Sequence, residues 1–315
     1  MSKLLEILAD GEPNSFKKLT ALLQLETKAL QHELNILQQQ GIEFEITQDS
    51  VRLIPQLELL DFTFLAKSLK PYQVFIKPVI DSTNQYLLEH LTQLNKGDLC
   101  LAEYQTAGRG RRGRQWLSPF AGQAILSFYW SFEPKKSIEG LSLVIGVAIA
   151  EALQQAGADG VSVKWPNDIL LNGRKLAGIL VEIANIKNGL LNLIVGIGIN
   201  LSLPKLTDHI DQPWAELCEV LPNLERNQLI IQIIKQIYHR LEQFEHNGIN
   251  AEFRQKWQEL DYFFGETVNI ITEKQTISGI ERGIDEYGYL QLESNDKAEL
   301  LRFNGGEVSL RKKST

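Results

Sequence analysis

The segment from Leu141 to Gly157, LSLVIGVAIAEALQQAG, is apolar on nearly every side of a helix. Such a helix has no polar face to present to solvent, so we expect it to be buried inside a domain and to end near Gly157. From about residue 65 onward, strand and helix patterns alternate on both sides of this segment. This alternation predicts a central domain of mixed α/β structure.

The elements expected around this buried helix follow from their hydrophobic periods. Strands are predicted in YQVFIKPVI, DLCLAEYQ, QAILSFYWSF, VSVKW and KNGLLNLIVGIGINL. A helix is predicted in STNQYLLEHLTQL, with Ser82 or Thr83 as its cap, and helical patterns return at 225–260. The remaining C-terminal segment has short strands separated by turn residues, which predicts a small β-barrel.

The N-terminal segment has a different pattern, in which short helices precede a hairpin. Helices are predicted over residues 2–9, 15–25 and 26–40, and a hairpin over residues 42–53. Leu30, Leu34 and Leu37 fall on one face of the third helix. Three helices followed by a hairpin form the outline of a winged helix-turn-helix. A small helical accessory domain would fit the same pattern.

The composition argues against several classes of protein. The net charge of −7 is unfavourable for binding nucleic acid over a large part of the protein surface, but it is compatible with a local basic site. The two cysteines cannot form a disulfide framework, and no Cys or His spacing indicates a structural metal site. The N-terminus does not resemble a signal peptide, and no stretch approaches the length of a membrane span. We therefore expect a reduced, cytoplasmic protein that does not associate with membranes.

Residues 108–114, GRGRRGR, gather four arginines and three glycines in a chain that is acidic overall. Glycines let the backbone approach a ligand closely, and arginines bind phosphate or carboxylate with two parallel donors. A solvated basic loop, or a short segment that touches RNA, would have the same composition. The position directly after a predicted strand favours a ligand-binding loop. Trp116 follows it and offers a stacking face for a base.

A second group of charged residues lies in KWPNDILLNGRKLAG, which has the turn dipeptide Asn172-Gly173. A two-residue hairpin there pairs Leu170 with Lys175 and Asp168 with Ala177. Strand alternation then places Asp168 and Lys175 on one face, with Lys164 upstream. This arrangement suits an anionic substrate with a metal or proton partner. A surface salt bridge on a hairpin is the alternative.

Two further motifs carry weaker signals. Gly196 and Gly198 alternate in the apolar strand VGIGIN, where glycine weakens the strand and so indicates close approach of a ligand or another backbone. The motif DSTNQY places hydroxyl and amide groups at a junction of strand and helix, where free backbone N–H groups are available. A plain helix cap would explain the second motif by itself.

Together, these motifs resemble the bacterial biotin–protein ligases. The matching segments are VIDSTNQYLLE, AEYQTAGRGRRGRQWLSPF, GLSLVIGVAIAE, VKWPNDILLNGRKLAGILVE, GIGIN, ERGID and GGEVSLR. With the N-terminal outline, the chain is similar to the bifunctional ligase and biotin-operon repressor. The resemblance implies an α+β multidomain protein with three domains: a winged helix-turn-helix (1–64), a mixed α/β biotin/lipoyl-ligase-type catalytic domain (65–266) and an SH3-like β-barrel (267–315).

The resemblance implies a two-step reaction. Biotin and MgATP form biotinyl-5′-AMP and pyrophosphate, and a lysine of the biotin carboxyl carrier protein of acetyl-CoA carboxylase then takes the biotinyl group. ATP, Mg²⁺ and biotin enter as substrates, and no permanently bound cofactor is expected. The loop of residues 108–114 would close over the reactive anhydride and keep water away from it.

The same resemblance assigns residues to each part of the site. The biotin contacts would be Ser82, Thr83, Asn84, Gln105, Arg109, Gly110, Arg111 and Lys175. The nucleotide contacts would be Arg111, Arg114, Trp116, Asn200 and Arg311. The groups closest to the chemistry would be Lys175, Arg111, Lys164 and Asp168.

The DNA-binding half of the resemblance is at odds with the charge. Residues 1–61 hold five basic and ten acidic side chains, whereas neutralisation of phosphate dominates DNA affinity. The predicted recognition helix offers Thr27, Lys28, Gln31 and His32 as DNA contacts. Binding of operator DNA by a homodimer loaded with biotinyl-AMP is therefore one expectation, and a ligase whose winged helix no longer binds DNA is its alternative. A biotin-sensing repressor without ligase activity and a lipoate–protein ligase are two further alternatives.

Overall fold

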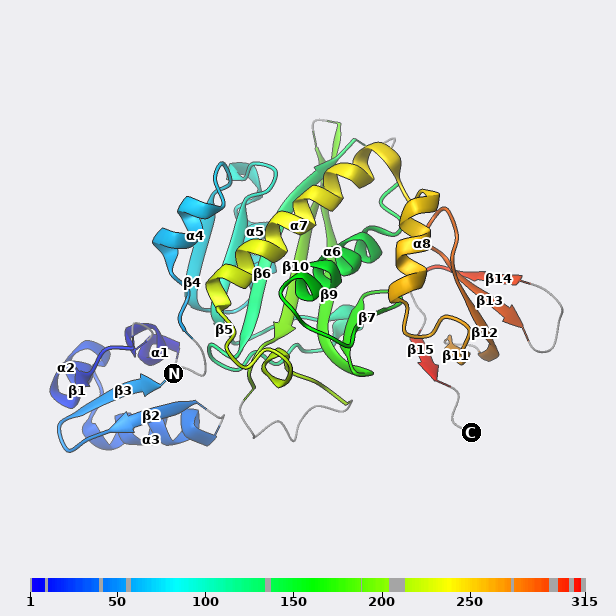
Figure 1. Cartoon of the computed structure of the whole chain (residues 1–315). Coiled ribbons are helices and arrows are strands. Elements are labelled where there is room, and N and C mark those ends of the chain that lie inside the picture. Colours follow the sequence, from blue (N-terminus) through cyan, green and yellow to red (C-terminus); the bar gives the residue numbers. More distant parts are fainter. Residues whose placement is uncertain are drawn as a thin grey trace.

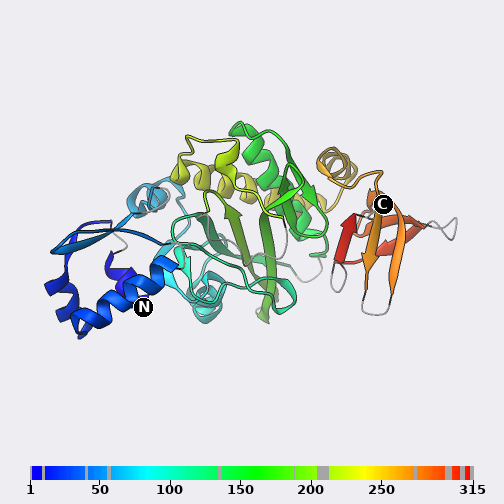
Figure 2. The ribbon, with the colours of Figure 1, turned by 90° about the horizontal axis from the view of Figure 1, so that it is seen from below.

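The computed structural model describes residues 2–8, 11–39, 42–54, 58–133, 137–187, 189–203, 213–272, 275–294, 300–305 and 309–312. They form three parts in a row, with the N-terminal helices at one end and the C-terminal strands at the other (Figures 1 and 2). Each part contains a β-sheet of its own, and the largest sheet is in the middle.

The N-terminal part contains the predicted helices and hairpin. Its elements are α1 (Ser2–Leu8), β1 (Asn14–Ser15), α2 (Phe16–Leu23), α3 (Thr27–Gln39), β2 (Glu43–Ile46) and β3 (Ser50–Ile54), with strand order β1-β3-β2. The side chain of Ser15 caps α2 by accepting a hydrogen bond from the Lys18 N–H. The predicted face of α3, with Leu30, Leu34 and Leu37, is buried against this small core.

The central part is built on a seven-stranded sheet of order β4-β5-β6-β10-β9-β8-β7. The strands are β4 (Val74–Ile80), β5 (Leu99–Gln105), β6 (Gln123–Phe132), β7 (Val161–Lys164), β8 (Asp168–Leu171), β9 (Arg174–Lys187) and β10 (Leu190–Asn200). The helices are α4 (Phe62–Ser68), α5 (Thr83–Glu89), α6 (Leu141–Gln155), α7 (Arg226–Asn247) and α8 (Ala251–Leu260), with short 3-10 turns at Leu91–Gln93, Arg111–Gly113 and Leu217–Glu219. The β4–β5 pair is parallel, and the other pairs of this sheet are antiparallel.

Helices cover both faces of this sheet. Leu99 and Leu101 of β5 pack into the core that contains α6 and α7, whereas Cys100 packs against α5, and successive side chains of a strand point to opposite faces. The apolar α6 is buried along most of its length and contacts α7, as its sequence predicts (Figure 1). Among the described helices, none is both long and apolar enough to cross a membrane.

The C-terminal part is an antiparallel sheet of order β14-β13-β12-β11-β15. Its strands are β11 (Thr267–Ile271), β12 (Thr276–Ile284), β13 (Leu290–Ser294), β14 (Leu300–Phe303) and β15 (Ser309–Lys312). The predicted short strands are present. Within the described residues the strand pairing does not close into a ring, so the barrel stays a prediction.

Two carboxyl groups, the partly buried Asp261 and the fully buried Glu281, lie where the C-terminal sheet meets the central part. Asp261, which follows α8, accepts hydrogen bonds from Trp257 Nε1 at 2.8 Å and from the Phe263 N–H at 3.1 Å. Glu281 of β12 has no solvent exposure and accepts from the Gly283 N–H. The two carboxyl groups are close enough for the charge of Asp261 to act on Glu281. Burial, and then the neighbouring charge of Asp261, raise the pKa of Glu281 to about 9.

This carboxyl pair predicts a pH-dependent stability. The folded protein keeps the Glu281 proton up to about pH 9, whereas an unfolded glutamate releases it near pH ~4.3. The folded state therefore binds more protons in this window, and the free energy of unfolding falls as the pH rises. Glu281→Gln cannot ionise, so its urea midpoint is expected to fall less than that of the wild type between about pH 6 and about pH 9.

Glu293→Gln is the control for this measurement, because Glu293 is half exposed and pairs with Arg282 on the surface. It is expected to keep the wild-type dependence on pH. Equal slopes for Glu281→Gln and the wild type would contradict the raised pKa of Glu281.

Candidate active site

A cavity of about 820 Å³ lies on the α5 face of the central sheet. The start of α5, the loop after β5, strands β7 to β10 and the last strand, β15, contribute to its wall. Every residue predicted above for biotin, nucleotide or catalysis lines it: Ser82, Thr83, Asn84, Gln105, Arg109, Gly110, Arg111, Arg114, Trp116, Lys164, Asp168, Lys175, Asn200 and Arg311. The fold thus brings together residues that are far apart in the sequence, since Ser82 and Arg311 are separated by 229 positions.

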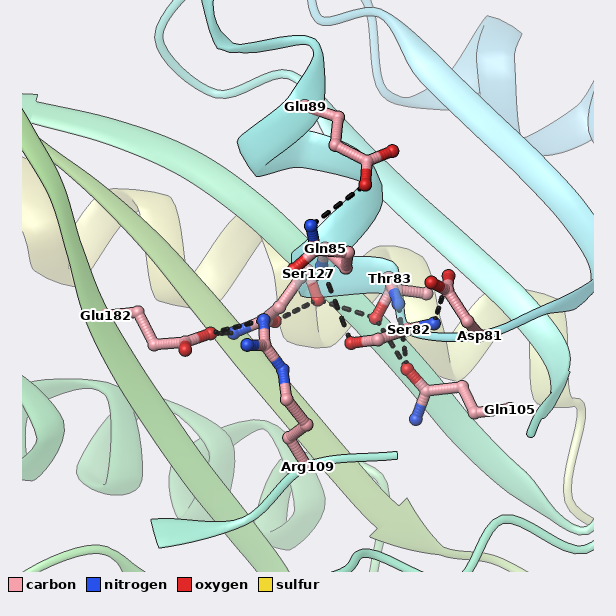
Figure 3. Close-up of polar contacts among 10 residues, drawn as sticks. Asp81, Ser82, Thr83, Gln85, Glu89, Gln105, Arg109, Ser127 and Glu182 are labelled. Carbon is pink, nitrogen blue, oxygen red and sulfur yellow. Dashed lines mark hydrogen bonds and ion pairs between the residues drawn. The ribbon is translucent and has the colours of Figure 1, made fainter. Parts of the chain in front are cut away.

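One end of the cavity is formed by uncharged polar side chains at the start of α5 (Figure 3). Ser82 is the N-cap, as predicted, and its side chain accepts from the Gln85 N–H. The Thr83 N–H donates to Gln105 Oε1 at 2.8 Å, and Thr83 Oγ1 lies 2.6 Å from Ser127 Oγ. Thr83 is almost fully buried, so these hydrogen bonds satisfy its polar atoms.

The two glycines of β10 make room for pocket side chains. A Cβ atom on Gly196 would lie 2.3 Å from Asn84 Oδ1, and one on Gly198 would lie 2.4 Å from Trp116 Cε2. Both distances are well below van der Waals contact. The VGIGIN motif predicted close approach of a ligand or another backbone, whereas the groups that approach these glycines in the structure are the side chains of Asn84 and Trp116.

The basic loop has a defined turn and protein partners for its arginines. Gly110 donates a backbone hydrogen bond to Arg114 at 2.7 Å, and Arg112 adopts the left-handed conformation with φ 59°. Arg111 Nη1 donates to Asn167 Oδ1 at 2.8 Å, and its Nη2 donates to the carbonyl oxygen of Gly305. Arg111 thus connects the loop with the Trp-Pro-Asn turn and with the C-terminal part.

The other end of the cavity is cationic. Lys175 Nζ lies 2.8 Å from Asp168 Oδ1, and Lys164 Nζ lies 3.8 Å from Asp168 Oδ2. Burial lowers the pKa of Lys164, and Asp168 partly opposes this shift. Burial also lowers the pKa of Arg111. Several cations face a single carboxylate here, an arrangement that attracts a polyanion.

The register of the hairpin differs from the prediction in one respect. Leu170 pairs with Lys175 as expected, but Asp168 pairs with Gly178 and not with Ala177. The register shifts between Ile169 and Leu170, because β9 carries an extra residue there, as in a β-bulge. Asp168 and Lys175 nevertheless meet in the cavity.

Trp116 and Asn200 are linked by Gln123, a residue that the sequence analysis did not select. Trp116 Nε1 donates to Gln123 Oε1 at 3.2 Å, and Gln123 Nε2 donates to Asn200 Oδ1 at 2.8 Å. The Lys175 ammonium lies 5.5 Å from the centre of the Trp116 ring. Lys175, Trp116 and Asn200 therefore face one region of the cavity.

Four polar residues that support the site were missed: Gln123, Ser127, Asn167 and Glu182. Polar side chains inside apolar strands were an available signal for Gln123 and Ser127, because buried polar groups need partners.

The residues predicted to contact DNA lie outside the cavity. Thr27, Lys28, Gln31 and His32 are exposed on α3, and none lines the cavity. The described residues contain no group of three or more metal-ligating side chains.

Comparisons with known proteins give the family. Residues 76–200 match the Biotin/lipoate A/B protein ligase family, and residues 263–311 match the Biotin protein ligase C terminal domain. The bifunctional ligase/repressor BirA of Escherichia coli K12 is 41% identical, over 98% of this chain and 96% of that protein. The chain belongs to the biotin–protein ligase family.

Other relatives support this membership. BirA of Bacillus subtilis 168 is 28% identical over 91% of both chains. The structure of the biotin protein ligase from Aquifex aeolicus in complex with biotin and ATP has a TM-score of 0.67 and 30% identity, and covers 76% of this chain and 99% of that one. As in other members of the biotin–protein ligase family, strands and helices are combined in the central part, and a β domain follows it.

The Gly198–Trp116 contact predicts the effect of one added methyl group. Gly198→Ala is expected to push the Trp116 ring from its place and to lower the free energy of unfolding by about 1–3 kcal/mol. Urea unfolding measures the loss, and calorimetric titration with ATP measures the effect on the cavity. Gly146→Ala is the control, since its added Cβ would lie an ordinary 3.7 Å from Ile179. A fully stable Gly198→Ala variant with normal ATP affinity would refute the contact.

Proposed function

We propose that the protein activates biotin with ATP to form biotinyl-5′-AMP, and then transfers the biotinyl group to a lysine of the biotin carboxyl carrier protein of acetyl-CoA carboxylase. The observation that carries this proposal is that neutral hydroxyl and amide groups gather at the start of α5, whereas Lys164 and Lys175 gather around Asp168 in the same cavity. Biotin has an uncharged ureido ring and a carboxylate tail, and ATP is a polyanion. The polar end therefore suits the ureido ring of biotin and the cationic end suits ATP, with the biotin carboxylate pointing toward the phosphates.

At the polar end, Ser82, Thr83, Asn84 and Gln105 are the proposed contacts of the ureido ring. Their hydroxyl, amide and backbone groups supply both donors and acceptors, as a ring with N–H groups and a carbonyl oxygen requires. Arg109 and Gly110 of the loop are the proposed neighbours of the same ligand.

At the cationic end, Lys175 and Arg111 are the proposed groups that stabilise the reacting charge. A biotin carboxylate oxygen attacks the α-phosphorus, the bond to the bridging oxygen breaks, and pyrophosphate leaves. Negative charge grows on the phosphate oxygens in this step, so fixed cations lower the barrier. Asp168 holds Lys175 in position through its 2.8 Å ion pair. Lys164 and Asp168 are the proposed partners of phosphate or of the Mg²⁺ that accompanies ATP.

The nucleoside has its own proposed contacts. Trp116 offers a face to adenine, with Asn200 beside it through Gln123. Arg114 and Arg311 are assigned to the phosphates because both line the cavity and lie near enough to Lys164 for their charges to act on it. In the second step the amine of the carrier lysine attacks the biotinyl carbonyl, AMP leaves, and the amine loses a proton.

We also propose that the protein represses genes of biotin synthesis, as a homodimer loaded with biotinyl-AMP. The proposed domains are a winged helix-turn-helix (1–64), a catalytic domain (65–266) and an SH3-like domain (267–315). Similarity to bifunctional ligase/repressors along 98% of the chain supports this role. A ligase without DNA binding is the second candidate, and the excess of acidic side chains in residues 1–61 favours it.

Arg111→Gly tests the role of the loop in retaining the intermediate. Removal of the guanidinium deletes bonds to Asn167 and Gly305 and opens the loop. Release of biotinyl-AMP into solution is expected to rise by about tenfold or more, and unrelated lysines become labelled. The measurement is labelling of a bystander protein with biotin and MgATP. Arg254→Gly, in α8 outside the cavity, is the control. Labelling confined to the carrier, at the normal rate, would exclude the retention role.

A shift assay decides between the two candidates for the N-terminal part. With biotin, MgATP and a biotin-operon promoter fragment, a repressor is expected to shift the fragment, and Lys28→Ala to weaken binding by about threefold to tenfold. Carrier labelling is expected to stay normal. Lys256→Ala, on α8, is the control. Normal labelling of the carrier with no shift of the promoter fragment at low salt would contradict DNA binding and leave the ligase as the only supported function.

A further inference from the structure

Glu182 of β9 connects two parts of the site that are separate in the sequence (Figure 3). Its Oε2 atom accepts a hydrogen bond from Asn84 Nδ2 at 2.5 Å and another from Arg109 Nη2 at 3.0 Å. Asn84 belongs to α5, and Arg109 belongs to the basic loop. One carboxylate oxygen therefore holds the start of α5 and the loop to the same strand.

The carboxylate fixes the orientation of the Asn84 amide. An ionised carboxylate only accepts hydrogen bonds, so the NH₂ group of Asn84 must face Glu182. Asn84 Oδ1 then faces Ser127, whose hydroxyl donates to it. Because Gly196 has no side chain, the amide fits against β10 in this position.

The orientation of the Asn84 amide also determines which hydroxyl groups donate and which accept at the polar end. A hydroxyl has one proton, and Ser127 gives its proton to Asn84, so Ser127 Oγ must accept from Thr83 Oγ1 at 2.6 Å. The proton of Thr83 then points away from the cavity. Gln105 Oε1, 3.1 Å from Thr83 Oγ1, competes for this proton, but it already accepts from the Thr83 backbone N–H at 2.8 Å, so we assign the proton to the shorter bond to Ser127. Thr83 thus presents acceptor lone pairs, which suit the N–H groups of a cyclic urea.

We infer that Glu182 is a positioning residue that sets the hydrogen-bond direction of the biotin end through Asn84 and anchors the loop through Arg109. This inference rests on the proposed function and deepens it. Glu182 does not line the cavity, so it acts through its two partners and not on the ligand.

The inference predicts a selective loss of biotin affinity. Glu182→Ala removes both bonds, and a hydrogen bond to a charged group contributes enough to raise Kd and KM for biotin by about tenfold. KM for MgATP is expected to change by less than about twofold. Glu182→Gln keeps an oxygen that can accept both bonds, so its values are expected to stay within about threefold of the wild type. Biotin binding is measured by calorimetry, and turnover by carrier labelling.

Two controls separate positioning from general damage. Glu89→Ala removes a carboxylate at the end of α5 that is exposed and accepts a hydrogen bond from Gln85 (Figure 3), and it is expected to leave biotin binding unchanged. In an Asn84→Ala background, Glu182→Ala is expected to add less than about twofold, because its main partner is gone.

The outcomes are distinct. Unchanged biotin affinity in Glu182→Ala would overturn the inference, as would equal losses for biotin and MgATP with a lower melting temperature. Independent effects in the double variant would also overturn it. A wild-type protein that neither binds biotin nor labels the carrier would instead overturn the proposed function.

Discussion

Gly196 and Gly198 leave β10 without side chains on the face where the cavity lies, although this strand is paired on both sides. The absence of these side chains lets Asn84 approach the sheet from α5 and lets Trp116 approach it from the loop. The polar end forms around Asn84, and the proposed nucleotide region forms around Trp116. A methyl group at either position would overlap these side chains, so the proposed assignment of the two substrates depends on two missing Cβ atoms.

The sequence predicted those parts of the structure whose cause is local. The apolar α6, the Ser82 cap and the Asn172-Gly173 turn each follow from neighbouring residues. The residues of the site were predicted from the family resemblance, and the fold gathers them around one cavity. What each of them binds remains a proposal.

The remaining features depend on pairing between distant segments. Nothing near Glu182 indicates that its partners are Asn84 and Arg109, because α5 and the loop reach it only after the sheet has formed. The bulge opposite Ile169 and Leu170 is a similar case, since a hairpin turn fixes the register only until an extra residue intervenes. The raised pKa of Glu281 requires the junction between the central and C-terminal parts, which brings Asp261 near it.

The N-terminal part has a core of its own, which reaches the central part through Val79, Phe120 and Ala121, whereas the core around α6 consists of other residues. Natural selection can therefore act on the two parts separately. Substitutions that make the surface of α3 more acidic do not disturb the packing around the cavity, and the enzyme carries no structural penalty from them. A lineage that stopped needing control of transcription could lose the charges that hold DNA while its catalytic centre stayed under full constraint.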